Sequence, residues 1–525
     1  MGKLVRGRYV LSGSCGHRTV IRDGAVYIEG DTIRDVGKYR ELSREYQPEL
    51  ELGSEDHLVM PGLVNAHHHR GGWGFWFQRG LLDAPLEKWL GLLPVYESQI
   101  SALSYDVTLF ACIKLIESGV TCVLDHRCAS VDPVDFGGYK KDLEDSIKAY
   151  ADSGMKVALA PAIQNRGDWV YDDEERFISE LPTEIREFFK PYHTNCQYDT
   201  ERRKNYFRAF SDLFEKYDGR NGRIRLVFGP TGVQWCTDDL LEEVKTNAKR
   251  FETGIHLHLL ETKYQMKYGI RKFGRTLVQH LVDLEFLGPD VSCAHSIWLT
   301  KEDIDLLAET GATVVHNPTS NCRIFSGIAP VLFMKEKGIN VALGMDGYWG
   351  LSDDDGMFET MRLAFVLHRV PGISSIGLTS NQILDMSTIG GAKAAGFENE
   401  IGAIIPGFKA DIILVNLKRA FSPPISSTIP ITDVIIHRFK TIDVDTVLVN
   451  GEVMMKDKKH TRVDKTEVLR RVEVAVKDIN EETRRKLDIY IEYLTDFYRK
   501  WDENPIGYTY NACMRPELYG PIGQS

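Results

Sequence analysis

Histidines spaced two residues apart end two apolar segments of this sequence. The segment Pro61 to His69 closes with His67 and His69, and a later segment contains His256 and His258. Side chains two apart on a β-strand point to the same side, so each pair can face one common space. Neutral imidazoles that converge in this way can bind a divalent cation. The spacing therefore favours a metal site where these strands end.

Further ionisable residues follow other apolar runs. Glu261 stands three residues after His258, and His295 and Asp346 each end a later run. A buried ionisable group is costly unless it is paired or bound to a metal. Because such a group recurs at strand after strand, we expect these side chains to meet at one site.

With these segments in view, the chain resembles the amidohydrolase superfamily from about Arg6 to about Met455. The most similar branch is that of the cytosine-deaminase-like enzymes, which includes adenosylhomocysteine deaminases and triazine hydrolases. The family's strand-one, strand-five, strand-six and strand-eight motifs are matched by Pro61, Gly62, Leu63, His67, His69, His258, Glu261, His295, Asp346 and Gly347. Its strand-seven pattern is matched by His316, Asn317, Pro318, Ser320, Asn321, Gly327, Ile328, Ala329 and Pro330.

The expected fold class is α/β, with a (β/α)8 TIM-like barrel, a small β-sandwich domain built from both chain ends, and a C-terminal helical extension. We expect the sandwich at 1–59 and 403–455, the hydrolase barrel at 60–402, and the extension with its tail at 456–525. This division follows the resemblance and the alternation of strand-like and helical segments between the two ends.

Local patterns predict particular elements. Residues 25–33 and 446–453 alternate like hairpins, the second turning at Asn450-Gly451, a pair suited to a type I′ turn. Helical periodicity covers 104–118, 238–251 and 301–310, and two more helices are expected after Lys456. The charged and aromatic stretch 168–212 is interpreted as an insertion that covers part of the barrel.

The resemblance implies one divalent ion, Zn²⁺ or Fe²⁺, held by His67, His69, His258 and Asp346. Binuclear relatives use a bridging carboxylated lysine or glutamate near strand four, and the segment 223–230 ends without one. A bound metal can lower the pKa of water to about 7. Asp346 would accept a proton from that water, Glu261 would carry it to the ring nitrogen or leaving group, and His295 would polarise the water or steady the intermediate.

Substrate contacts are expected from residues around the barrel mouth, and most of them have an equally simple structural explanation. Trp73 and Trp76 belong to an aromatic loop that could stack on a flat ring or contact another subunit. Glu97 matches a carboxylate that contacts the sugar in adenosine-type deaminases, although it could be an exposed helical residue. The remaining candidates are His126, which could equally be a packing residue, His316 and Asn317, where Asn-Pro could simply end a strand, and Thr231 and Trp349. His256 is interpreted as a core histidine bonded to a neighbour.

The sequence departs from the nucleoside deaminases at two places. Thr231 follows Gly229-Pro230 where those enzymes usually carry histidine, and Tyr348 and Trp349 replace a Ser-Asn-Asn turn after Asp346. These changes predict a small, flat, partly apolar aromatic or heteroaromatic substrate rather than adenosylhomocysteine.

Composition excludes some other classes of protein. With 525 residues and a net charge of −11, the chain is not suited to nucleic acid or anionic membranes as main partners. Nine cysteines without CxxC spacing fit reduced thiols. We see neither a signal peptide nor an apolar run long enough for a bilayer, and we expect a cytoplasmic homo-oligomer.

Three functions stay open at this point. The preferred one is deamination of an aminated N-heteroaromatic small molecule by metal-activated water. The second is hydrolysis of an amide, urea or carbamate, or hydrolytic dechlorination, of an aromatic substrate at the same site. The third is a non-catalytic relative that serves in assembly, against which the intact ligand set and Glu261 argue.

Overall fold

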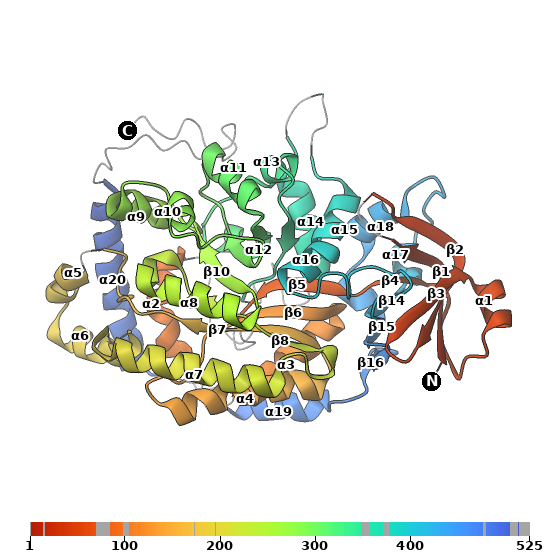
Figure 1. Cartoon of the computed structure of the whole chain (residues 1–525), viewed down its shortest axis with the longest axis horizontal. Helices are drawn as coiled ribbons and strands as arrows, with labels where there is room; N and C mark the ends of the chain where they lie inside the picture. The colour runs from red at the N-terminus through yellow and green to blue at the C-terminus, as the bar shows by residue number, and fades with distance from the viewer. Residues whose placement is uncertain are drawn as a thin grey trace.

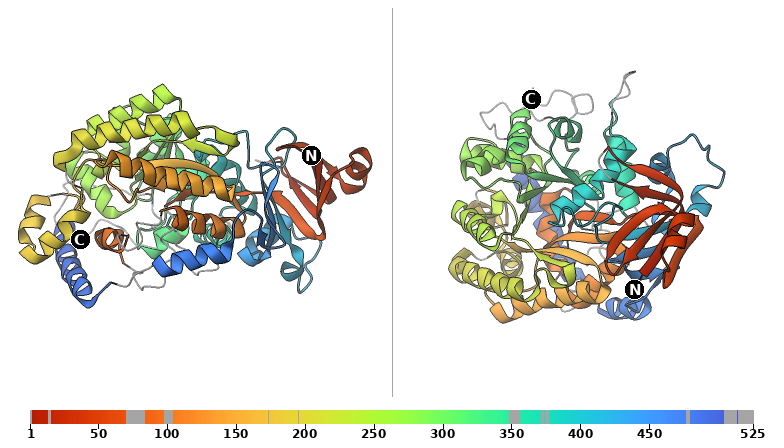
Figure 2. Two further views of the ribbon diagram at one scale, coloured as in Figure 1. Left: turned by 90° about the horizontal axis from the view of Figure 1, so that it is seen from below. Right: turned by 45° about the vertical axis from the view of Figure 1, so that its right-hand side comes forward.

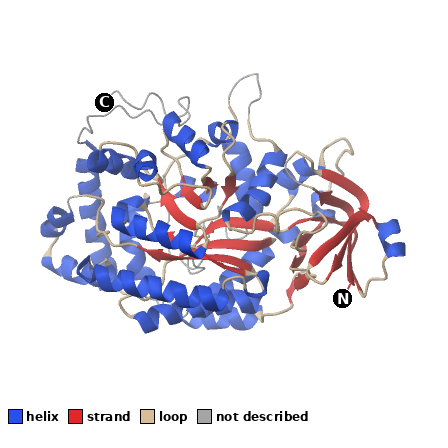
Figure 3. Ribbon diagram, viewed as in Figure 1, coloured by secondary structure: helices blue, strands red, loops and turns tan. Residues whose placement is uncertain are grey.

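Two units make up the protein, a barrel and a sheet domain, which lie at the left and right of Figure 1. We describe them from a computed structural model of the chain. The structure describes residues 2–13, 16–69, 84–97, 104–172, 174–194, 196–347, 356–370, 373, 377–475, 479–503 and 513. Within these residues, helices surround the barrel strands, as Figure 3 shows, so the expected fold class is confirmed.

Eight parallel strands form the barrel within the described ranges. They are β5 (Leu63–His68), β6 (Val120–Arg127), β7 (Lys156–Ile163), β8 (Ile224–Leu226), β10 (Ile255–Leu259), β11 (Val291–His295), β12 (Thr313–His316) and β13 (Val341–Leu343). Each pairs with its neighbour in parallel, the short β9 (Gly229–Pro230) adds to β7, and a bridge from Phe228 to Ile255 joins the two halves. The strands are buried on both faces, which explains their almost continuous apolar sequences.

The barrel helices follow their strands in chain order. They are α2 (Leu86–Glu97), α3 (Ser104–Glu117), α4 (Phe136–Ser153), α7 (Asp199–Tyr217), α8 (Asp238–Phe251), α9 (Lys263–Phe273), α10 (Leu277–Asp283), α11 (Lys301–Thr310), α12 (Pro318–Arg323), α13 (Val331–Glu336), α14 (Met357–Leu367), α15 (Ser380–Met386) and α16 (Ile389–Ala394). The three helices predicted from periodicity are confirmed as α3, α8 and α11. No helix in the described part of the chain has the length and apolar character that crossing a membrane requires.

The sheet domain is built from both ends of the chain. Its strands lie in the order β17 (Lys459–His460), β16 (Glu452–Lys456), β15 (Val444–Val449), β14 (Ile412–Asn416), β4 (Leu50–Pro61), β1 (Gly2–Ser12), β2 (Thr19–Glu29) and β3 (Thr32–Lys38). Figure 2 shows the N-terminal strands in red beside the C-terminal ones in blue. Helices α1 (Tyr39–Glu45), α17 (Leu417–Ala420) and α18 (Ile431–Arg438) flank this sheet in sequence.

The domain that the sequence predicts as a sandwich is one continuous hydrogen-bonded sheet of eight strands in the described residues. Val26 and Ile28 of β2 share a buried cluster with Ile412 and Leu448 from the other half, so both halves face one apolar core. The β15–β16 hairpin turns as predicted, because Asn450 and Gly451 both have positive φ, at 49° and 69°. The sheet extends slightly beyond the expected limits, to Pro61 and His460, and the domain limits themselves stay predictions.

The insertion is shorter than expected. It holds the short helices α5 (Glu174–Glu180) and α6 (Thr183–Phe189). The prediction that it reaches Asp212 is wrong, because α7 packs on α4, β7 and β8 as a barrel helix. The large apolar residues that this helix buries are Tyr206, Phe210 and Leu213. Their helical periodicity begins only midway along the helix. The sequence before Tyr206 is too charged to predict the helix start.

The two helices predicted after Lys456 are confirmed, and they pack on the barrel. Helix α19 (Lys465–Ala475) buries Val468 and Val472 against α3 and α4. Helix α20 (Glu481–Glu503) lies against α2 and α6. The C-terminal extension is therefore part of the body of the protein.

A buried ion pair joins the barrel to the sheet domain. Nζ of Lys156 on β7 lies 2.6 Å from Oδ1 of Asp411, and neither side chain is more than 1% exposed. The same ammonium donates to the side chain of Asn450, whose backbone N–H donates to Asp411 at 2.9 Å. Removing one partner of a buried pair leaves an uncompensated charge, which typically costs about 3–5 kcal/mol.

We therefore expect Lys156→Met to lower the free energy of unfolding by about 3–5 kcal/mol. Chemical denaturation of the whole chain measures this loss. The matched control is Lys141→Met, because Lys141 makes an exposed ion pair with Asp145 at 2.6 Å and should be dispensable. Equal stability of the two variants would show that the buried pair does not hold the units together.

Candidate metal centre and active site

The predicted metal ligands converge at the carboxyl end of the barrel. Nε2 of His69 lies 3.1 Å from Nε2 of His258 and 3.3 Å from Oδ1 of Asp346. Nε2 of His67 lies 3.5 Å from the same carboxylate oxygen. Three imidazoles and one carboxylate around one point form a donor set that suits Zn²⁺ or Fe²⁺.

Barrel closure brings Asp346 to the histidines. The segment after β13 forms a parallel bridge with the end of β5, in which the N–H of Asp346 donates to the carbonyl of His67 at 2.9 Å. Asp346 adopts φ of 57°, and His295 adopts φ of 71°. Residues other than glycine hold this conformation at a cost, typically where a site requires a particular orientation. The strain therefore falls on two residues with predicted catalytic roles.

Hydrogen bonds outside the ligand set orient the imidazoles. Nδ1 of His69 donates to the carbonyl of His126 at 2.9 Å, and Nδ1 of His258 donates to that of Thr231 at 2.7 Å. Both rings therefore present Nε2 to the common point, as metal-binding histidines usually do. Nε2 of His67 is buried and makes no hydrogen bond to a described residue. A cation would satisfy this atom, so the residues present fit a metal ion.

Burial favours the neutral form of two of these ligands. It lowers the pKa of His67 and of His258 well below the usual range, and neighbouring imidazoles lower both further. A neutral imidazole has the lone pair that a metal needs.

Glu261 and His295 stand beside the ligands. Oε1 of Glu261 lies 3.6 Å from Nδ1 of His295, and Nε2 of His295 lies 3.8 Å from Oδ2 of Asp346. Nδ1 of His295 donates to Oδ1 of Asn321 at 2.8 Å. Ser320 donates to Oδ2 of Asp346 at 2.6 Å. The strand-seven motif therefore orients the catalytic candidates.

A cavity of about 550 Å³ opens on this centre. Helix α2 supplies an apolar wall with Leu86, Trp89, Leu90, Leu93 and Pro94, and the predicted centre supplies His69, His258, Glu261, His295 and Asp346. The remaining lining is more polar and includes Thr231, Gln164, Asp168, His193 and Thr194. Such a volume is typical of a site for a small molecule.

Among the predicted substrate contacts that the structure describes, one lines the cavity and three do not. Thr231 lines the cavity, whereas His126, His316 and Asn317 are buried and do not. The ring of His126 packs 4.8 Å from that of His258, between centroids, and His316 lies 3.0 Å from His368, between Nε2 atoms. The Asn317 amide lies 3.4 Å from Nδ1 of His295.

Four of the aromatic and acidic candidates cannot be placed. Trp73, Trp76 and Trp349 lie outside the described residues, as does the side chain of Glu97 at the end of α2. Their roles stay predictions.

Sequence reasoning missed the cluster at the outer end of the cavity. Nδ1 of His193 lies 2.9 Å from Oδ1 of Asp168, and Nε2 of His193 lies 3.1 Å from the hydroxyl of Tyr490 on α20. Trp169 stacks on His193 with ring centroids 3.9 Å apart. Asp168 and His193 stand in the expected insertion without any motif, so no signal in the sequence could have singled them out.

Comparisons with known proteins agree with this geometry. The model of the amidohydrolase family matches residues 58–454. A 5'-deoxyadenosine deaminase of Methanosarcina barkeri is 32% identical over 462 residues, which cover 87% of this chain and 94% of that protein. A 5-methylthioadenosine/S-adenosylhomocysteine deaminase of Caldanaerobacter subterraneus is 33% identical over 452 residues, which cover 85% and 92%.

Solved structures share the fold. An adenosine deaminase from Xanthomonas campestris with bound zinc aligns with a TM-score of 0.74 at 22% identity, over 90% of this chain and 97% of that one. A zinc complex of the atrazine chlorohydrolase from Arthrobacter aurescens aligns with a TM-score of 0.75 at 20% identity, over 90% and 100%. Because the family model covers residues 58–454 and the two curated relatives are 32% and 33% identical, the chain belongs to the amidohydrolase family and is a hydrolase that acts on carbon–nitrogen bonds.

Proposed function

We propose that the protein deaminates an adenine-containing small molecule, with one divalent metal ion, Zn²⁺ or Fe²⁺, in each subunit. The observation that carries the proposal is the meeting of three histidines and Asp346 at one point, with His69, His258, Asp346 and Glu261 facing one cavity. The two curated relatives act on 5'-deoxyadenosine, 5-methylthioadenosine and S-adenosylhomocysteine according to their names. The homo-oligomeric state and the cytoplasmic location stay predictions.

The site suits addition of water to a ring carbon that bears an amino group. A divalent ion bound by the ligand set would lower the pKa of a water molecule to about 7. Asp346 lies where it can accept a proton from that water, because its Oδ1 faces His67 and His69. Because Nδ1 of His295 carries the hydrogen donated to Asn321, its Nε2, beside Oδ2 of Asp346, can accept a hydrogen bond from the incoming water and orient it.

Glu261 is suited to deliver a proton to the ring. Burial raises its pKa well above the usual range, and the nearby carboxylates of Asp346 and Glu87 raise it further. Its backbone N–H donates to Oε1 of Gln265 at 2.8 Å, which anchors the loop that carries it. A protonated carboxyl in the cavity can give its proton to a ring nitrogen, the role of a general acid. The proton that Asp346 takes from the water can then pass to the amino group, which leaves as ammonia, while the hydroxyl proton of the adduct returns to Glu261.

The apolar wall of the cavity favours an apolar substituent on the ring. Leu90, Leu93 and Pro94 of α2 offer that substituent an apolar surface. We infer that the substituent is apolar, as in a 5'-deoxy or 5'-methylthio nucleoside, and lacks the charged amino-acid group of adenosylhomocysteine.

A panel assay tests this function. Metal-loaded protein is incubated with 5'-deoxyadenosine, 5-methylthioadenosine, adenosylhomocysteine, aryl ureas, anilides and a chlorinated triazine, and ammonia and product mass are measured. We expect an amino group to be replaced by oxygen, with the two smaller nucleosides turned over more efficiently than adenosylhomocysteine. Cleavage into two fragments or loss of chloride would instead support the second hypothesis. No turnover in any arm would contradict catalysis of this class.

The Glu261→Gln variant tests the proton transfer. Because Gln keeps the size of the side chain but carries no transferable proton, we expect kcat to fall by about 10²–10⁴-fold. Metal content should be unchanged, because Glu261 is not in the proposed ligand set. The exposed Glu302 on α11 provides the control as Glu302→Gln. Retention of more than about a tenth of kcat would refute the assignment.

Glu87 is a second buried carboxyl behind Glu261. Its Oε1 accepts hydrogen bonds from the hydroxyls of Thr262, at 2.5 Å, and Tyr171, at 3.1 Å. Burial raises its pKa from 4.5 to about 7. The sequence offered no reason to single out this residue, since it stands in the first turn of α2 without a motif.

The raised pKa of Glu87 makes stability depend on pH. Below about pH 4.5 the carboxyl is protonated in both states, so it contributes no pH dependence there. As pH rises from about 4.5 to about 7, the unfolded chain has lost a proton that the folded protein retains, so stability falls until the folded carboxyl also ionises. A shift of this size corresponds to at most about 3 kcal/mol.

We therefore expect Glu87→Gln to become progressively more stable than the wild type from about pH 5 to about pH 8. Gln can still accept both hydrogen bonds through its carbonyl oxygen. Denaturant unfolding at several pH values measures the difference, and the exposed Glu215→Gln is the matched control. A difference that does not change with pH would mean that Glu87 titrates as it would in water.

A further inference from the structure

A chain of hydrogen bonds runs from the metal centre through the barrel interior. Nδ1 of His67 lies 2.7 Å from Nε2 of His256, and Nδ1 of His256 lies 2.7 Å from Oγ of Ser292. The Ser292 hydroxyl donates in turn to the carbonyl of Ile255 at 3.3 Å. His256 stands two residues before the ligand His258 on β10, and it faces Ser292 in the register of β10 and β11.

The serine end of this chain sets its direction. Because the Ser292 hydrogen is donated to Ile255, its oxygen is available to accept the N–H at Nδ1 of His256. A neutral His256 then has an acceptor at Nε2, which takes the hydrogen at Nδ1 of His67. The lone pair of His67 is thereby left on Nε2, the buried atom beside Asp346 that makes no hydrogen bond to any described residue.

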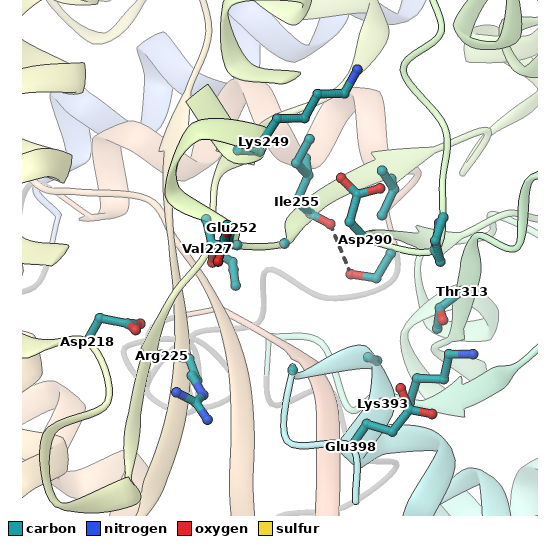
Figure 4. Close-up of a pocket in the computed structure, with 18 of the residues that line it drawn as sticks. Asp218, Arg225, Val227, Lys249, Glu252, Ile255, Asp290, Thr313, Lys393 and Glu398 are labelled. Atoms are coloured by element: carbon teal, nitrogen blue, oxygen red, sulfur yellow. Dashed lines mark hydrogen bonds between the residues drawn. The ribbon is translucent and has the colours of Figure 1, made fainter. Parts of the chain in front are cut away.

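Ser292 opens on a hollow at the other end of the barrel. This cavity of about 640 Å³ lies where β8, β10, β11 and β12 begin, and its lining includes Ile255, Asp290, Thr313 and Ser292. Figure 4 shows it, with the hydrogen bond at the Ile255 carbonyl dashed. His256 itself is fully buried. Ser292 therefore borders open space, whereas His256 does not.

We propose that His256 and Ser292 are positioning residues for the metal ligand His67. They hold its ring in the tautomer and orientation that direct Nε2 at the metal. The other two histidine ligands use backbone carbonyls for this purpose, and His67 is distinct in using a side-chain relay. Hydrogen-bond partners of metal ligands typically change metal affinity or activity by about 10–100-fold when removed. The inference rests on the metal site of the proposed function.

The alternative is that both residues only fill space between strands. Loss of metal affinity would then follow the volume of the substituted side chain. If the relay operates, the loss follows hydrogen-bonding capacity instead, so pairs of variants of similar size separate the two explanations.

Metal affinity of the whole chain, measured by chelator competition for Zn²⁺, is the readout, together with the absorption spectrum of the Co²⁺ form. We expect His256→Leu to weaken affinity by about 10–100-fold and to alter the Co²⁺ spectrum. His256→Gln, which retains an acceptor and a donor, should restore most of the affinity. His280→Leu on α10, where His280 pairs with Asp238 at 3.0 Å, is the control and should bind metal normally.

A second pair of variants does not alter the histidine. Ser292→Ala removes the acceptor for His256 and should weaken Zn²⁺ binding by several-fold, whereas Ser292→Thr keeps the hydroxyl and should bind like the wild type. If His256→Leu does not fold, this pair still decides the question. Wild-type affinity in Ser292→Ala, or equal losses in Ala and Thr, would overturn the proposal. No substrate is used, so failure of the relay and failure of the deaminase assignment are distinguishable.

Discussion

The closure of the barrel between its first and last strands is the constraint on which the site depends. His68 donates through Nδ1 to the carbonyl of Asp346 at 2.8 Å, and the N–H of Met345 donates to the side chain of Asn65 at 2.8 Å. These bonds join segments 278 and 280 residues apart in sequence. Asp346 reaches the histidines of β5 only through this closure. Without it, the carboxylate and the His-x-His pair would belong to separate ends of an open sheet.

The passage from the sheet domain into the barrel is equally constrained. β4 ends at Pro61 and β5 begins at Leu63, so Gly62 alone separates the two units. A Cβ at Gly62 would lie 2.3 Å from Oγ1 of Thr121, which leaves no room for any other residue. This close approach sets the position of β5, and therefore of His67 and His69, relative to β6. The glycine of the opening motif has a packing role beside the chemistry.

The outer part of the cavity depends on elements beyond the common family core. The family model ends at residue 454, yet Tyr490 of α20 bonds His193 at the cavity, and Tyr490 also stacks on Phe189 of α6 at 3.9 Å between ring centroids. The C-terminal helix and the insertion thus stabilise each other at the cavity's outer wall. The cavity wall therefore includes a helix that lies outside the part of the chain matched by the family model.

By itself, the sequence determined the elements and the ends of strands at which chemistry is possible. The i, i+2 histidines, the helices at 238–251 and 301–310, and the Asn450-Gly451 turn follow from local periodicity and turn chemistry, which neighbouring residues decide. Tertiary structure decided which nitrogen of each imidazole faces the common point of the ligand set. It also placed Asn317 and His126 behind the cavity. Finally, it brought Asp168, His193 and Glu87 near the cavity. These outcomes depend on contacts between residues distant in sequence, for which no local pattern exists. The start of α7 was missed for the same reason, because its first turns pair with distant residues, Arg202 with Asp132 and Arg203 with Glu243, and have no apolar spacing of their own.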